Sequence, residues 1–370
     1  MLEAHFKKTL GDFTLDARLF AGAGQVTALF GPSGAGKSTL ASCLAGLIDP
    51  DEGHFKFDGT VLYDSKSNTR VPPEQRRIGT VFQDSRLFPH LSVAGNLNYG
   101  LSRTPKEQRH VKLDQVVDIL DIKDLLNRPV KALSGGEKQR IAFGRAVLTS
   151  PRLLILDEPL ASLDSARKAE ILPFIERLRD ELSIPMIYVS HSIDEILRLA
   201  DDVVVLNRGS VVRAGPAVET LNSETIVHGD RANNGIEPGS VIEARVETAD
   251  SYDGLTILNV EGKDGKVSGG QLYVPQFQCS PDDRIRLRIR ARDVALATSK
   301  PKDLSILNVL AGKIMAISPQ GDAHSDIMID IGADLWARIT RRSTSELSLT
   351  VGQVVYVLIK SVAIDRSTSG

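Results

Sequence analysis

The sequence predicts an α/β domain built on a mostly parallel sheet, followed by a smaller all-β region. Up to about residue 230, short apolar runs with strand character alternate with helical patterns, which is typical of a parallel sheet covered by helices. Beyond that point, short alternating runs separated by glycines indicate strands joined by tight turns. With 370 residues, the chain is long enough for two or three domains.

The composition limits the classes of protein to consider. The chain is 42% hydrophobic and 25% charged, as expected of a globular protein with a full core. Its net charge of -2 provides no overall field for nucleic acid, so we expect no nucleic-acid partner. Cys43 and Cys279 are too few for a disulfide framework, and neither lies in a metal-binding spacing. Charged residues interrupt the start of the chain, and no apolar run approaches the ~18 residues of a membrane span, so we expect neither a leader nor a span.

Local patterns place the main elements of the first region. The predicted strands, which are apolar and rich in β-branched residues, cover residues 25–30, 153–156 and 186–189. The predicted helices, which have apolar residues at helical spacing, cover residues 37–47, 111–126 and 164–182. Pro173 predicts a kink in the helix at 164–182.

Turn-forming residues divide the chain. We expect a first domain over residues 1–230, with a mainly helical insert at about 84–140. The turn formers of residues 231–239 indicate a linker, because glycine, proline and asparagine disfavour regular structure. A β-rich segment is expected over residues 240–300, and a second small β domain over residues 302–366.

Arginine alternates with apolar residues over 284–292. The alternation places Ile285, Leu287 and Ile289 on one face of a strand and the arginines on the other. We therefore expect a half-buried strand with a solvated arginine face, in preference to a nucleic-acid or anion site.

A phosphate-binding loop is predicted between the first core strand and the first helix. The motif consists of Gly31, Pro32, Ser33, Gly34, Ala35, Gly36, Lys37, Ser38 and Thr39. Its glycines allow backbone N–H groups to surround an anion at a helix N-terminus. The Lys37 ammonium is expected on the β- and γ-phosphates of a nucleotide, and the Ser38 hydroxyl on Mg²⁺.

An acidic pair follows the strand at residues 153–156. Asp157 would reach the carboxyl edge of the sheet, where it can hold the Mg²⁺ shell. Glu158 is a candidate general base that can polarise an attacking water molecule. Alone, such a pair is as typical of a helix cap, but together with the phosphate-binding loop it indicates nucleotide hydrolysis.

A third motif, LSGGEKQR, begins at Leu133. Ser134 is a suitable N-cap, and with Glu137 it could form a capping box. A capped helix start leaves Gly135 and Gly136 unexplained, because glycine weakens a helix by about 1 kcal/mol per residue. Glycines without a Cβ would instead let the backbone approach a phosphate at the helix N-terminus.

These three motifs, in this order, resemble the ATP-binding subunits of ABC transporters over about residues 1–230. The resemblance implies a P-loop NTPase fold with a helical subdomain. It also implies that Gln83 senses Mg²⁺ and water, that residues 162–164 touch a partner subunit, and that His191 lies near the γ-phosphate. The family also stacks an aromatic residue on adenine, for which Phe6 and Phe13 are the open candidates.

The family pairs the P-loop of one subunit with the signature motif of another. Since this chain has one of each, the resemblance implies a homodimer with two composite ATP sites. It also implies a separate membrane permease, docked near Phe88, and indirectly a solute-binding protein outside the membrane. The expected location is therefore peripheral, on the cytoplasmic side of the cell membrane.

The end of the chain resembles the Mop or TOBE-type, OB-like domain of molybdate importer ATPases. The matching segments are residues 305–310, 335–339 and 360–364. A tetrahedral oxyanion is bound by hydroxyl, backbone N–H and ammonium groups, and Ser305, Lys360 and Ser361 provide such groups. The alternative is that these three residues merely lie at strand ends.

The sequence thus predicts the ATPase subunit of a bacterial importer for an oxyanion, most simply molybdate or tungstate, with ATP and Mg²⁺ as cofactors. Importers of sulfate, polyamines, iron or sugars are alternatives, because similar β-tails occur there. A non-transport ABC ATPase is a further alternative. That class typically has a long coiled-coil insertion or two cassettes per chain, and this sequence has neither.

Overall fold

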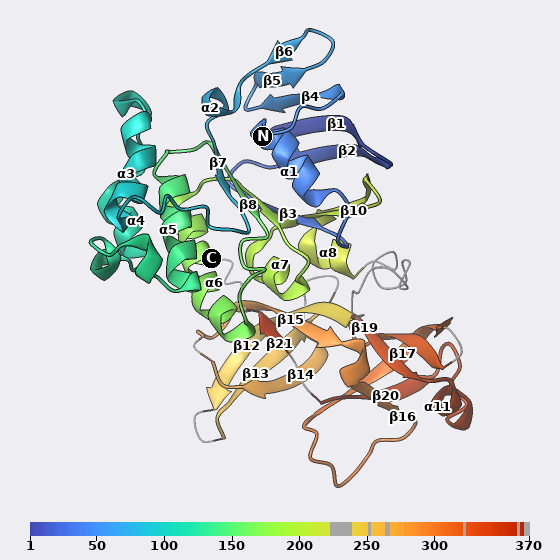
Figure 1. Cartoon of the computed structure of the whole chain (residues 1–370). Coiled ribbons are helices and arrows are strands. Elements are labelled where there is room, and N and C mark those ends of the chain that lie inside the picture. The colour runs from blue at the N-terminus through green and yellow to red at the C-terminus, as the bar shows by residue number, and fades with distance from the viewer. Residues whose placement is uncertain are drawn as a thin grey trace. The chain divides into compact units, whose positions relative to one another are not determined.

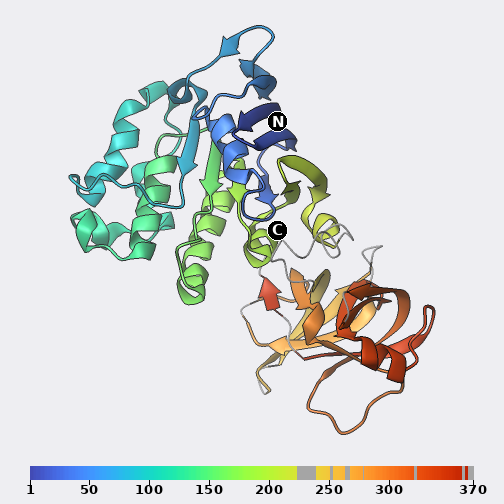
Figure 2. The same cartoon turned by 45° about the vertical axis from the view of Figure 1, so that its right-hand side comes forward.

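The computed structural model forms two compact units (Figure 1, Figure 2). Unit 1 consists of Met1–Ala217, and unit 2 of Val218–Gly370. The structure describes residues 1–222, 239–250, 253–262, 267–277, 279–320, 323–360 and 363–365. The predicted linker at 231–239 therefore lies, except for Gly239, outside the described residues.

Unit 1 is built on an eleven-stranded sheet in the order β6-β5-β4-β1-β2-β11-β10-β3-β9-β8-β7. Its strands are β1 (Leu2–Leu10), β2 (Phe13–Ala21), β3 (Val26–Phe30), β4 (Glu52–Phe57), β5 (Thr60–Asp64), β6 (Thr69–Arg70), β7 (Ile78–Val81), β8 (Leu153–Asp157), β9 (Met186–Val189), β10 (Asp202–Asn207) and β11 (Ser210–Pro216).

The strands β10, β3, β9, β8 and β7 are parallel neighbours. Every residue of β3 and β9 is buried, which explains why their sequences are continuously apolar instead of alternating. The three core strands predicted from the sequence are confirmed as β3, β8 and β9.

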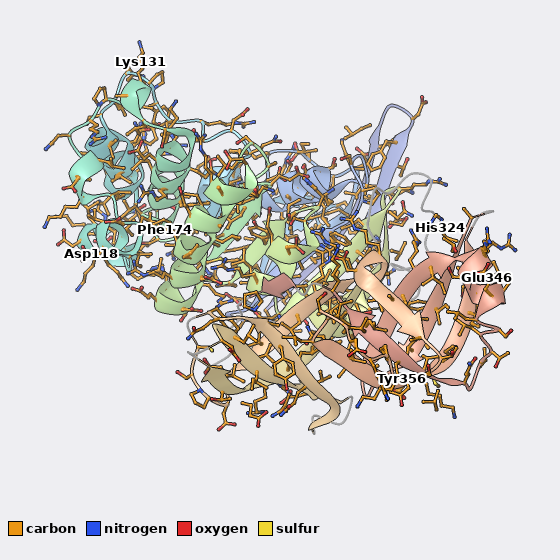
Figure 3. The ribbon with its side chains drawn as sticks, turned by 90° about the horizontal axis from the view of Figure 1, so that it is seen from below. Asp118, Lys131, Phe174, His324, Glu346 and Tyr356 are labelled. Atoms are coloured by element: carbon orange, nitrogen blue, oxygen red, sulfur yellow. The ribbon has the colours of Figure 1, made fainter. Side chains whose placement is uncertain are left out.

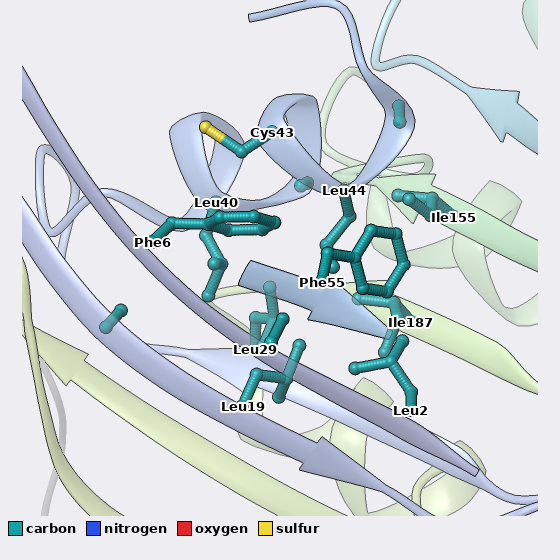
Figure 4. Close-up of a cluster of buried hydrophobic side chains, with 14 of the residues drawn as sticks. Leu2, Phe6, Leu19, Leu29, Leu40, Cys43, Leu44, Phe55, Ile155 and Ile187 are labelled. Carbon is teal, nitrogen blue, oxygen red and sulfur yellow. The ribbon is translucent and has the colours of Figure 1, made fainter. Parts of the chain in front are cut away.

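In the other half of the sheet, neighbouring strands are antiparallel except for β11 and β2, which pair in parallel. Strand β1 pairs with β2 on one side and with β4 on the other. Buried and exposed residues alternate along much of β1 and β2. The inward side chains pack around the first helix, where Phe6 and Phe55 lie edge to face with ring centroids 6.0 Å apart (Figure 4).

The helices of unit 1 are α1 (Lys37–Ala45), α2 (Pro73–Arg76), α3 (Val93–Arg103), α4 (Leu113–Ile119), α5 (Gly135–Val147), α6 (Ser165–Leu182), α7 (Ile193–Leu199) and α8 (Ala217–Leu221), the last of which extends into unit 2. The predicted helix at 37–47 is shorter, because Gly46 takes the left-handed conformation that ends helices.

The single helix predicted over 111–126 is wrong. The chain forms α4 and then a 3₁₀ turn at Lys123–Leu125, because Asp121 adopts a positive φ of 48° that interrupts the helix. Arg177 of α6 donates to the carbonyl oxygens of Asp118 and Ile119 at the end of α4. Figure 3 labels Asp118 and Phe174 on this helical side of unit 1.

Unit 2 contains two five-stranded antiparallel sheets, ordered β14-β13-β12-β15-β21 and β16-β20-β17-β18-β19. Its elements are β12 (Gly239–Asp250), β13 (Leu255–Glu261), β14 (Val267–Pro275), β15 (Arg284–Arg290), β16 (Val294–Ala297), β17 (Asn308–Gln320), β18 (His324–Asp330), β19 (Asp334–Thr340), α11 (Arg341–Glu346), β20 (Val354–Ile359) and β21 (Ala363–Asp365). Figure 3 labels His324 at the start of β18 and Glu346 at the end of α11.

The two sheets exchange strands. Strand β16 comes from the earlier part of the unit but pairs with β20, whereas β21 comes from the end of the chain and pairs with β15. Both sheets contribute to one hydrophobic core.

The apolar face of β15 is buried, as the alternation predicts. The expectation of a solvated arginine face holds in part. Arg284 and Arg292 are exposed, whereas Arg288 is only 8% exposed. Arg284 and Arg245 donate to the two carboxylate oxygens of Glu261, which is itself 4% exposed. These two arginines therefore satisfy a buried carboxylate within the unit.

Among the described residues, no helix is long and apolar enough to span a membrane.

The two thiols are expected to differ in reactivity. Cys43 lies in α1 and is fully buried, and burial raises the pKa of its thiol to about 12, so little thiolate forms near pH 8. Cys279 is half-buried. We expect a chromogenic disulfide reagent to titrate one thiol in the folded chain and two after denaturation. Rapid labelling of the folded Cys279→Ser variant would contradict the placement of Cys43.

Candidate functional site

The site lies at the carboxyl edge of three adjacent parallel strands. The phosphate-binding loop follows β3, the acidic pair ends β8, and His191 follows β9, which lies between them. Parallel strands place their carboxyl ends at the same edge of a sheet, which is where open α/β sheets bind ligands. The phosphate-binding loop, the acidic pair and His191, which are distant in the sequence, therefore meet here.

Lys37 is held inside the phosphate-binding loop. Its Nζ donates to the carbonyl oxygens of Gly31 and Pro32, both at 2.9 Å. Burial lowers the pKa of Lys37, while the neighbouring carboxylates of Glu158 and Asp157 act in the opposite direction. The loop therefore holds a largely desolvated ammonium at the start of α1, where an anion would stabilise it.

Ser38 and Asp157 come together as predicted. Ser38 Oγ donates to Asp157 Oδ1 at 2.9 Å. Burial raises the pKa of Asp157, and the hydrogen bond from Ser38 partly offsets this effect. A hydroxyl and a carboxylate are hard oxygen donors of the kind that Mg²⁺ prefers, so these residues fit the ion.

The chain supplies only part of a metal shell. Within the part that the structure describes, no group of three or more His, Cys, Asp or Glu residues could hold a metal ion. Two oxygen donors beside a phosphate-binding loop are consistent with Mg²⁺, which commonly takes its remaining ligands from water and substrate phosphates.

Glu158 is positioned by its backbone. It adopts a positive φ of 46°, an uncommon conformation for a residue other than glycine, and its N–H donates to Val189 O of β9 at 3.0 Å. Its carboxylate lies 3.8 Å from Lys37 Nζ and 3.5 Å from His191 Nδ1. Glu158 thus faces both the phosphate-binding loop and the histidine.

Gln83 is exposed just beyond β7, and its loop is held from α5. Arg145 donates to the carbonyl oxygens of Ser85 and Arg86 at 3.2 and 2.8 Å. Arg86 covers the Phe82 ring at 3.9 Å from its centroid, and its charge acts weakly against the burial that raises the pKa of Asp157. Arg86 and Arg145 could not be predicted from the sequence, because an arginine in a loop or helix carries no motif.

Phe88 is half-buried. Its ring lies 4.4 Å from that of Tyr99, and the Arg145 guanidinium lies 4.9 Å from its centroid. A cleft of about 380 Å³ beside it is also lined by Tyr99 and Arg103.

The signature motif caps α5. Ser134 Oγ accepts from the N–H of Glu137, and the Glu137 carboxylate accepts from the N–H of Ser134, which is a complete capping box. Neither Gly135 nor Gly136 has a positive φ, and an added Cβ would meet neighbours at 3.5 and 3.4 Å, which is ordinary contact. Within the residues that the structure describes, neither backbone conformation nor packing therefore requires this glycine pair.

The two aromatic candidates for adenine stacking differ. Phe6 is fully buried and unavailable. Phe13 is half-buried at the start of β2, and its ring edge lies 2.8 Å from the place where a Cβ on Gly36 would be. Phe13 thus borders the phosphate-binding loop.

Two of the three predicted oxyanion residues of unit 2 lie just outside the ends of two paired strands. Ser305 precedes β17 and Lys360 follows β20, and these strands pair with Asn308 opposite Ile359. Both side chains are exposed. Ser361 lies outside the described residues.

Two family models match the chain. The model described as "ABC transporter" matches residues 16–161, and the model described as "TOBE domain" matches residues 304–365.

Several relatives match over nearly their whole length. The Molybdenum import ATP-binding protein ModC of Mesorhizobium japonicum is 49% identical over 98% of this chain and 95% of that protein. The protein of the same name from Rhizobium etli is 48% identical, over 97% of this chain and 98% of that protein. Among solved structures, cbiO1 from Clostridium perfringens, described as part of the ABC transporter complex cbiONQ, has a TM-score of 0.52. It is 28% identical and covers 62% of this chain and 94% of that chain.

Replacing Gly36 with Ala tests the phosphate-binding loop. Gly36 has a φ of 102° and Phe13 blocks its Cβ position, so we expect a loss of about 1–3 kcal/mol in unfolding free energy and at least tenfold weaker binding of a fluorescent ATP analogue. Gly24→Ala is the control, since Gly24 has a φ of 70° with open space around it. That variant should lose stability but bind nucleotide normally. Unchanged nucleotide affinity in Gly36→Ala would contradict the placement.

Proposed function

Since this chain belongs to the ABC transporter ATPases and, among them, to the family of molybdenum import ATP-binding proteins, we propose that it hydrolyses ATP to drive molybdate import. The observation that carries the proposal is the meeting of Lys37, Asp157, Glu158 and His191 at one sheet edge. The TOBE-domain match supports an importer of this branch over a non-transport ATPase.

Nucleotide binding would exchange internal contacts for phosphate contacts. Lys37 Nζ, which now donates to Gly31 and Pro32, would instead donate to the β- and γ-phosphate oxygens. Ser38 Oγ and, through its shell, Asp157 would hold Mg²⁺, with Gln83 reaching the same region. When bound, Mg²⁺ neutralises charge on the phosphates. Phe13, which borders the phosphate-binding loop, would contact adenine.

Hydrolysis would use Glu158 as the base. Its carboxylate would accept a proton from the attacking water, and the neighbouring Lys37 and His191 would stabilise the charge that develops on the γ-phosphate. His191 is 54% exposed, so its imidazole can reach a nucleotide at the surface of the subunit.

We further propose a homodimer with composite sites. The glycine pair at 135–136 is required neither by backbone conformation nor by packing, so a ligand outside the chain is its simplest explanation. Ser134 and the N–H groups at the start of α5 would complete the phosphate contacts of the partner subunit's nucleotide. The two subunits would then close on ATP and separate again after hydrolysis.

The transport partners follow from the same family. A permease would dock beside Phe88, in the cleft that Tyr99 and Arg103 also line, and would receive molybdate from a solute-binding protein. The chain would thus lie at the cytoplasmic face of the cell membrane. In unit 2, exposed Ser305 and Lys360, with Ser361, would provide hydroxyl and ammonium donors for an oxyanion.

Replacing Glu158 with Gln tests the base. The amide cannot accept the proton, so we expect ATP hydrolysis to fall by about 100-fold or more while ATP binding persists. Hydrolysis is measured by phosphate release and binding by a fluorescent analogue. Glu181→Gln, an exposed carboxylate of α6, is the matched control and should be fully active. Undiminished turnover in Glu158→Gln would remove Glu158 from the mechanism.

Calorimetric titration tests the role of unit 2. We expect the full-length chain to bind molybdate and tungstate saturably but not sulfate, and the Lys360→Ala variant to lose this binding because the ammonium is absent. Lys313→Ala removes another exposed lysine of the same unit, from β17, and should bind normally. Absence of binding in the unaltered chain would contradict an oxyanion site here and leave the ATPase assignment intact.

A further inference from the structure

A buried carboxylate lies directly behind the His191 loop. Glu195, in the first turn of α7, is 5% exposed. Its Oε2 accepts hydrogen bonds from Tyr188 Oη and Ser190 Oγ, both at 2.8 Å, and its Oε1 accepts from Lys168 Nζ at 2.8 Å. A carboxylate removed from water is tolerated where donors of this kind surround it.

The donors come from three separate elements. Tyr188 belongs to β9, Ser190 to the loop that follows it, and Lys168 to α6. Burial raises the pKa of the Tyr188 phenol well above its usual value, so its hydroxyl stays protonated and donates. Glu195 therefore joins a core strand, the histidine loop and a neighbouring helix in one charged network.

This network contacts the residues on both sides of His191. Ser190 Oγ also accepts from the N–H of Ser192 at 3.0 Å, and Ser192 Oγ accepts from the N–H of Glu195 at 3.4 Å. The residues before and after His191 are thus held by Glu195 or by its immediate contacts. The His191 side chain itself points away, to within 3.5 Å of Glu158.

Lys168 connects the network to the loop at 162–164. It lies one turn into α6, and its N–H donates to the carbonyl oxygen of Asp164, the N-cap of that helix. The sequence resemblance assigns residues 162–164 to the contact with the partner subunit. The buried ion pair of Lys168 and Glu195 therefore links that loop to His191.

We infer that Glu195 is a positioning residue for ATP hydrolysis, which holds the His191 loop against β9 and α6 so that the imidazole faces Glu158 and the γ-phosphate. The inference rests on the proposed ATPase function. A purely structural role for Glu195 would predict only lost stability. A positioning role also predicts lost activity, because the network holds both neighbours of one site residue.

The test is a double-mutant cycle on the full-length chain. Glu195→Gln keeps the side-chain shape but cannot accept from all three donors, so kcat should fall about tenfold or more at little changed KM. Misplacement of a reacting group by ~1 Å can cost up to about 100-fold. In a His191→Ala background, Glu195→Gln should lower kcat by less than about twofold further, because the group that it positions is absent.

Glu176→Gln is the matched control. Glu176 of α6 accepts from Arg198 of α7 at 2.6 and 2.7 Å, so this variant breaks a second ion pair between the same helices without touching the His191 loop. It should lower the melting temperature to an extent similar to Glu195→Gln but leave kcat unchanged.

Other outcomes are decisive. Equal kcat in Glu195→Gln and the unaltered chain, or full additivity with His191→Ala, would overturn the inference while leaving the ATPase function standing. Absence of hydrolysis in the unaltered chain would instead contradict the proposed function. If Glu195→Gln does not fold, Ser190→Ala provides the same test, because it removes only the hydroxyl that connects Glu195 to the N–H of Ser192.

Discussion

The site depends on the parallel pairing of β9 with β3 on one side and with β8 on the other. Val189 lies opposite Leu29 in the first pairing and opposite Asp157 in the second, so the ends of the three strands are level. All residues of β3 and β9 are buried, and an altered register would disrupt the packing on both faces of the sheet. Because that register is so strongly determined, Lys37, Asp157, Glu158 and His191 lie together at the carboxyl edge of these three strands.

The charged groups at the nucleotide site and those behind it differ in how well their charges are compensated. At the nucleotide site, burial lowers the pKa of Lys37 and raises that of Asp157, so both charged forms are poorly compensated and would gain from a bound phosphate and a cation. Behind the site, Glu195 accepts from three donors and is fully compensated. Poorly compensated charges are thus found at groups that would meet ligands, whereas the charge of Glu195 behind them is met by three donors, as a preorganised site requires.

Unit 2 uses buried ion pairs for a different purpose. Glu261 accepts from arginines on two strands, and Asp326, which is fully buried, accepts from Arg338 at 2.8 and 3.0 Å. Such pairs cost desolvation, but they penalise any other strand alignment in which a charge would be left alone. Together with the exchange of β16 and β21 between the sheets, they make the β-rich segments of this unit one body that shares a core.

The sequence by itself determined the elements that carry chemistry. The phosphate-binding loop, the strand before Asp157 and Glu158, and the capped helix after Ser134 are each specified by consecutive residues, because glycine conformation, capping and apolar runs are local properties. Only the tertiary structure decided how these pieces combine. It placed β9 between β3 and β8, divided the helix expected at 111–126 at Asp121, buried Arg288 and assembled the contacts of Glu195. Burial, strand order and ion-pair partners arise between residues far apart in the chain, and no pattern within a single segment reports them.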